Sequence, residues 1–233
     1  MYQRLDPDRI VATARQLARR VEERFPDSGL GRVSAELVQV TERAAADTGW
    51  LGRPHRGLRI GIWILIGFLL IAVIGAAVTL LPEPGRATLS EVLQAVESAV
   101  NDLVFLGIAV WFLLSLETRW KRRRALDSLH RLRAMAHIID MHQLTKDPER
   151  VVSPDSGPDT PSSPARTMTA FELSRYLDYA SEMLSLLGKA AALYLQDFDD
   201  PVAIATVNEI ESLTTGLSRK IWQKIMIIDR VVG

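Results

Sequence analysis

Residues 58 to 81 form an apolar run whose only charged side chain, Arg59, lies at its edge. An α-helix rises about 1.5 Å per residue, and the hydrocarbon core of a bilayer is about 30 Å thick. Roughly 20 apolar residues therefore suffice to cross a membrane. The run predicts a transmembrane helix over about 58–81, and hence an integral membrane protein.

A second apolar run covers 103–116, which is short for a complete crossing on its own. The residues before it contain no helix breaker, and Thr88 with Glu91 forms the S/T-x-x-E pattern of a capping box. We therefore predict a second transmembrane span over about 96–117. The outer loop 82–88 then joins two antiparallel spans.

The positions of lysine and arginine predict the orientation of the two spans. Arginines precede the first span, a basic cluster follows the second, and the loop between them holds Arg86 alone. Because Lys and Arg favour the cytoplasmic side, both termini are expected in the cytoplasm of a multi-pass membrane protein. Arginine outnumbers lysine 23 to 5, which fits a high-GC bacterial source. In a bacterium the expected location is the inner (cytoplasmic) membrane, and the alternative is a eukaryotic organelle membrane.

The basic cluster after the second span has two interpretations. It is a positive-inside signal, and it is a binding site for anionic lipid headgroups, to which each basic residue contributes about 1 kcal/mol. Its members are Arg119, Lys121, Arg122, Arg123 and Arg124. The formal net charge of the whole chain is +0 at pH 7, so nucleic acid is not an expected partner.

The rest of the chain alternates helical periodicity with breaks and shows no strand pattern, so the expected fold is all-α: a two-helix transmembrane hairpin with a cytoplasmic helical bundle. Helix starts are marked by Asp6-Pro7, by a capping box at Thr169 and Glu172, and by Asp200-Pro201. The predicted regions are N-terminal cytoplasmic helices at 1–57, the transmembrane hairpin at 58–118, a cytoplasmic extension of the second transmembrane helix at 119–145, a Pro/Ser-rich linker at 146–168, and a C-terminal helical hairpin at 169–233.

Wide apolar stripes run along both helices of the C-terminal hairpin and must be buried against something. They predict packing on the N-terminal helices and the extension of the second span, and they also offer a face for a second copy or a cytoplasmic protein partner. The residues of this interaction face are Leu177, Leu184, Leu187, Val207, Leu217 and Ile221. The leading hypothesis is a non-enzymatic, homo-oligomeric membrane protein whose helical domain mediates self-assembly or partner binding.

Polar residues at membrane depth suggest an alternative function. Asn101 and Asp102 lie inside the predicted second span, and the first span has no cation in its core to pair with Asp102. A charge in lipid is costly and normally faces a partner or water. An oligomeric ion channel with this helix around a cation pathway would use Glu97, Ser98, Asn101, Asp102, Phe105 and Phe112. The competing interpretation is an Asp102 side chain hydrated near the outer interface or bonded to a neighbouring helix.

Catalytic and metal sites leave little trace in the sequence. The chain has no cysteine, and no phosphate loop, G-x-S-x-G, H-E-x-x-H or dinucleotide motif is present. His137 and Asp140 are three residues apart and offer at most a weak metal pair, since zinc takes three or four ligands. No cofactor is expected, and a membrane-tethered enzyme of unknown type is the third and weakest hypothesis.

Overall fold

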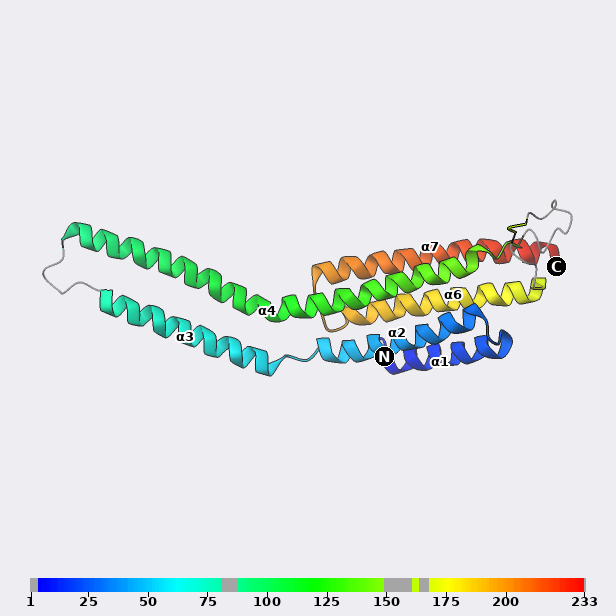
Figure 1. Ribbon diagram of the computed structural model, residues 1–233, viewed down its shortest axis with the longest axis horizontal. Coiled ribbons are helices and arrows are strands. Elements are labelled where there is room, and N and C mark those ends of the chain that lie inside the picture. Colours follow the sequence, from blue (N-terminus) through cyan, green and yellow to red (C-terminus); the bar gives the residue numbers. More distant parts are fainter. Residues whose placement is uncertain (1–3, 81–87, 149–160, 164–167, 233) are drawn as a thin grey trace. The chain divides into compact units, whose positions relative to one another are not determined.

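Helices make up most of the described residues, 4–80, 88–148, 161–163 and 168–232 of the computed structural model (Figure 1). Within those ranges there is no strand. The helices are α1 (Pro7–Arg24), α2 (Gly29–Leu51), α3 (Arg56–Leu80), α4 (Leu89–Leu144), α6 (Ala170–Ala192), the 3₁₀ turn η1 (Leu193–Leu195) and α7 (Pro201–Val232). The all-α prediction is confirmed.

Two compact units make up the chain, and each is described by itself. One consists of Met1–Arg53 together with Arg122–Gly233 and is called the bundle below. The other consists of Pro54–Lys121 and is called the hairpin. Helix α4 includes residues of both units, so the predicted extension of the second span at 119–145 is helical up to Leu144, and its cytoplasmic location stays a prediction.

Helix starts follow the local capping chemistry. The Asp6 carboxylate accepts the N–H groups of Asp8 and Arg9 at the start of α1. Thr169 and Glu172 form the reciprocal capping box of α6, as predicted. The other predicted box cannot be followed, because the side chain of Glu91 lies outside the described residues.

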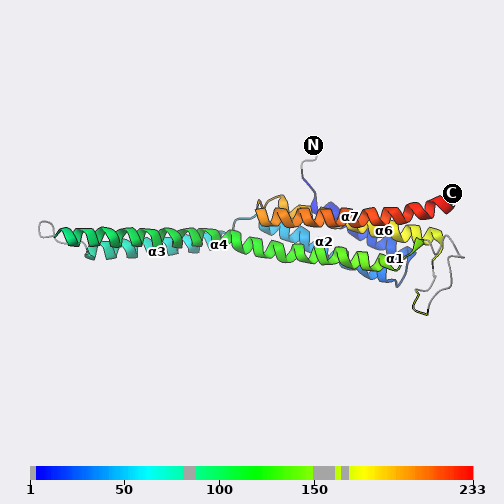
Figure 2. The ribbon, with the colours of Figure 1, turned by 90° about the horizontal axis from the view of Figure 1, so that it is seen from above.

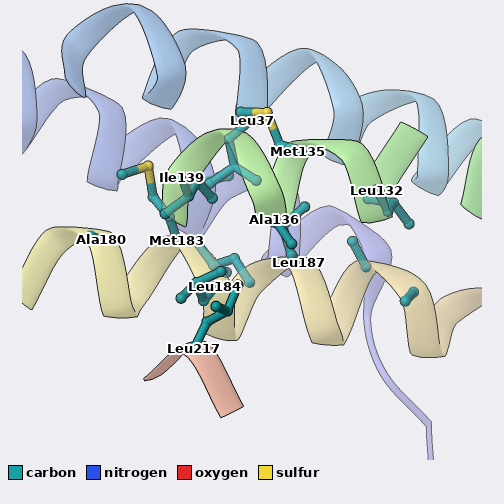
Figure 3. Close-up of a cluster of buried hydrophobic side chains, with 14 of the residues drawn as sticks. Leu37, Leu132, Met135, Ala136, Ile139, Ala180, Met183, Leu184, Leu187 and Leu217 are labelled. Carbon is teal, nitrogen blue, oxygen red and sulfur yellow. The ribbon is translucent and has the colours of Figure 1, made fainter. Parts of the chain in front are cut away.

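The bundle is built around α6, whose apolar side chains are buried on nearly every turn. Figure 3 shows side chains of α2, α4, α6 and α7 meeting around Met183 and Leu184, both fully buried. Helices α6 and α7 lie side by side along the bundle in both ribbon views (Figures 1 and 2). The core thus collects one apolar face from each of five helices, α1, α2, α4, α6 and α7.

The apolar side chains of the hairpin, unlike those of the bundle, are mostly on its surface. The hairpin contains two helices that are long and apolar enough to cross a membrane, and their large side chains are mostly exposed. Among the α3 side chains that the structure describes, Ile62 and Ile66 are the buried ones, at 7% and 4% exposure. Leu69 and Val73 continue the same helical stripe and are half-buried. Exposed apolar side chains on all other faces suit a lipid environment better than water.

Candidate functional site

The polar residues of the predicted pathway lie on an open surface of α4. All six members of that set are exposed, with Phe105 at 72% and Phe112 at 46%. Neither Asn101 nor Asp102 has a hydrogen bond or ion pair with any described residue. Of the two aromatic residues in the set, Phe112 has a ring contact: the Cζ atom of Arg119 lies 4.9 Å from the centre of its ring. The set therefore lies on an accessible surface of α4, and the described residues form no enclosed site around it.

A stripe along α4 connects Asp102 to the base of the hairpin. Asp102, Leu106, Val110, Leu113 and Glu117 follow one another at helical spacing. Glu117 is buried at 8% exposure, the three apolar side chains are half-buried, and Asp102 is exposed. Exposure along this stripe therefore rises from the buried Glu117 to the exposed Asp102.

A cluster of charged groups lies at the base of the hairpin, the end where α3 begins and where α4 reaches Lys121. The Glu117 carboxylate accepts from Arg59 Nε at 2.8 Å and from the backbone N–H of His55 at 3.3 Å. Lys121 Nζ lies 3.1 Å from the same carboxylate, one helical turn further along α4. These contacts tie the start of α3 to α4 and fix the register of the two helices. In the sequence, the feature that could have indicated this cluster is Glu117, a single acidic residue just before five basic ones.

The five basic residues proposed for lipid headgroups have different environments. Within the hairpin, Lys121 pairs with Glu117, and Arg119 lies over the aromatic rings of Trp111 and Phe112. The three that belong to the bundle are Arg122, Arg123 and Arg124.

Within the bundle, Arg122 pairs with Asp200 and Arg124 with Asp47. Arg123 is exposed and has no hydrogen bond, ion pair or ring contact with a described residue. Arg122 and Arg124 therefore already have partners inside the bundle.

Asp47 is the centre of a buried polar network that the sequence did not reveal. Its carboxylate accepts from Arg124 Nε at 3.0 Å, from the Ser128 hydroxyl at 2.8 Å and from the Tyr194 hydroxyl at 3.1 Å. The Arg124 guanidinium also lies 4.3 Å from the centre of the Trp50 ring, within cation–π range. Burial raises the pKa of the Tyr194 hydroxyl above its ordinary value. The network joins α2, α4 and η1 through groups that are costly to leave unpaired.

Asp200 has a second structural role at the start of α7. One carboxylate oxygen accepts the N–H groups of Val202 and Ala203, and the other lies 2.7 Å from Arg122. Burial favours the neutral acid, but the Arg122 guanidinium and the two N–H groups outweigh it and hold the pKa of Asp200 below its ordinary value. The predicted N-cap is confirmed, and its pairing with a basic residue that follows the span is new.

The predicted interaction face is enclosed by the chain itself. Its six side chains are at most 5% exposed, and all belong to the single core of the bundle. A partner would reach this face only if the bundle opened. The members are Leu177, Leu184, Leu187, Val207, Leu217 and Ile221.

The end of α4 carries the proposed metal pair. Asp140 accepts a hydrogen bond from the Gln143 amide at 2.6 Å, and His137 is exposed. Lys224 of α7 donates to the Gln143 carbonyl and amide oxygens and to the Lys146 carbonyl, at 2.7 to 3.0 Å. Burial lowers the pKa of this lysine.

The described residues hold no group of three or more His, Cys, Asp or Glu side chains placed to bind a metal ion. Comparison with known proteins adds no function, because the chain matches no family model, no curated protein and no solved structure.

Proposed function

We propose that the chain is a non-enzymatic, homo-oligomeric protein of the bacterial inner membrane. The hairpin crosses the bilayer twice, both termini lie in the cytoplasm, and copies associate through their spans. The observation that supports association in the membrane is the contrast in burial. The bundle already encloses its apolar stripes, whereas the polar residues Asn101 and Asp102 in the hairpin have no partner among the described residues.

The bundle has a separate role in this proposal. A fold with a continuous internal core does not need a second copy to bury its apolar residues. It is then a preformed cytoplasmic module whose outer surface is available to a protein partner. The continuous helix α4 links this module to the membrane.

The test of assembly is the mass of the purified full-length protein in lipid nanodiscs. The expected particle contains two or more copies, and a particle with one copy contradicts the proposal. Topology is tested separately with single-cysteine variants, since the chain has no cysteine. Ala12→Cys in α1 should react with an impermeant maleimide only from the cytoplasmic side, and Ser90→Cys at the start of α4 only from the outer side.

A cation pathway is the second candidate. It is favoured by the exposed carboxylate and amide of Asp102 and Asn101 on the same helix as Phe105 and Phe112. In an oligomer, such residues form an acidic ring with an apolar constriction below it. Cation flux into liposomes should then fall several-fold in Asp102→Asn while the particle mass stays the same. The absence of flux in the unaltered protein, or equal flux in the variant, contradicts this function.

A further inference from the structure

The loop 196–200, which joins η1 to α7, contacts three separate segments of the bundle. Its last residue, Asp200, caps α7 by accepting the N–H groups of Val202 and Ala203. Phe198, at its centre, is 8% exposed and belongs to the core of the bundle. The loop is thus anchored at its centre and at its end, which fixes the positions of the side chains on either side of Phe198.

The N-terminal segment is the first of the three. The Arg4 guanidinium donates to the Gln196 carbonyl at 2.9 Å and pairs with the Asp197 carboxylate. The Gln196 amide donates in turn to the Leu5 carbonyl at 3.2 Å. The Arg4 side chain is 61% exposed, so these contacts can break without opening the core.

The other two segments are the ones that precede and follow the hairpin in the sequence. Gly52, which ends α2, comes two residues before the hairpin, and Arg122 is the first bundle residue after it. A Cβ atom added at Gly52 would lie 3.1 Å from the Asp197 Cβ atom, so the loop packs directly on the backbone there. Asp200 pairs with Arg122 at 2.7 Å. One loop therefore contacts the bundle at both of its junctions with the hairpin.

We infer that the loop 196–200 is a regulatory clamp that couples the N-terminal segment to both junctions. Asp197 and Asp200 lie on either side of the anchored Phe198, so a displacement at one carboxylate is passed to the other through two backbone residues. Release of the N-terminal segment then loosens the chain at both junctions. The inference deepens the proposed function, and rests on it only for the statement that the hairpin crosses the bilayer.

A second link between the same two segments limits the size of the effect. Arg124 contacts both Asp47 and Trp50 near the end of α2, and none of these three residues belongs to the loop. The bundle therefore stays folded when the clamp is released. The expected change is local opening at the junctions, which hydrogen exchange of individual backbone N–H groups measures.

The experiment uses the full chain in lipid nanodiscs. The N–H of Gly52 donates to the Thr48 carbonyl and reports the first junction. The N–H groups of Val202 and Ala203 donate to the carboxylate that holds Arg122, and they report the second.

Two single variants break the contact of the N-terminal segment with the loop. Arg4→Ala and Asp197→Ala each remove one partly exposed ion pair, so exchange at both junctions should be about two- to fivefold faster. The double variant should exchange no faster than the faster single variant, because both changes remove the same contact. Since coupling between two positions is reciprocal, Asp200→Asn should in turn accelerate exchange of the Gly52 N–H.

Arg133→Ala is the matched control, because it removes another exposed ion pair of the bundle, with Glu209, away from the loop. It should leave both junctions unchanged. Acceleration at one junction alone, at neither, or equally in the control refutes the clamp. Equal acceleration throughout α6 also refutes it, since that result indicates a general loss of stability. A nanodisc particle with one copy contradicts the proposed assembly and leaves the coupling intact, so the two failures are distinguishable.

Discussion

The Asp47 network gives the most quantitative prediction for the bundle. In Asp47→Ala the hydroxyls of Ser128 and Tyr194 lose their acceptor inside the core, where their residues are 4% and 2% exposed. An unsatisfied buried hydroxyl costs about 1–2 kcal/mol. The Arg124 side chain is about half exposed and can be solvated by water in the variant, so the loss of its ion pair adds little to the cost. The sum is a decrease of about 2–4 kcal/mol in the free energy of unfolding.

The matched control is Glu42→Ala on the same helix. Glu42 also pairs with an arginine of another helix, Arg15, but both side chains are about half exposed, at 42% and 56%. An exposed ion pair of this kind contributes less than about 1 kcal/mol. Urea unfolding of the full chain in mild detergent, followed by circular dichroism, measures both variants. If Asp47→Ala loses no more stability than Glu42→Ala, the energetic account of the network is refuted.

Three further predictions concern the same bundle. Lys224→Met should lower stability by about 2 kcal/mol, because it removes charged donors from carbonyls at the end of α4, and exposed Lys220→Met should change little. Burial raises the pKa of Tyr176 to about 12 from 10.0, so the unfolded chain releases this proton first. Stability should therefore fall between pH 10 and pH 12, by at most about 2–3 kcal/mol, and Tyr176→Phe should flatten that loss. The pKa of Asp200 is lower in the folded chain than the ordinary value of 3.8, so this group stabilises the fold above pH 3.8 and the stabilisation is lost as the pH falls below it. Asp200→Asn should remove this pH dependence of stability, measured by thermal unfolding from pH 5 to pH 2.

Local chemistry explains which parts of the fold could be predicted. Caps such as Thr169 with Glu172 depend on neighbours in the sequence, and both the prediction and the structure place them at the same helix start. The helix that continues past the second apolar run was predicted for the same reason, since nothing between Leu89 and Leu144 interrupts it. Periodicity also identified the buried stripes. It could not say whether the chain or a partner covers them, because both satisfy the same pattern.

Long-range polar contacts were beyond the reach of the sequence. Asp47 looks like an ordinary surface acid in α2, and only the packing of α4 and η1 brings Arg124 and Tyr194 to it. The same holds for Lys224, whose acceptors lie about 80 residues earlier in the chain. Each contact joins two helices whose relative position is set by apolar burial, which a charge pattern does not encode.

The environments of the basic residues after the second span change what that cluster can do. A basic residue that contacts anionic headgroups at the membrane surface contributes about 1 kcal/mol to lipid binding. If Arg122 left Asp200 to make such a contact, the Asp200 side chain, only 1% exposed, would lose its counter-charge. An unpaired buried charge costs about 3–5 kcal/mol, so lipid does not displace this pair. The pairing of Arg124 with Asp47 is protected by the same argument. If anionic lipid binds this cluster, we expect the headgroup contacts at Arg119 and Arg123, which have no ion pair with a described residue.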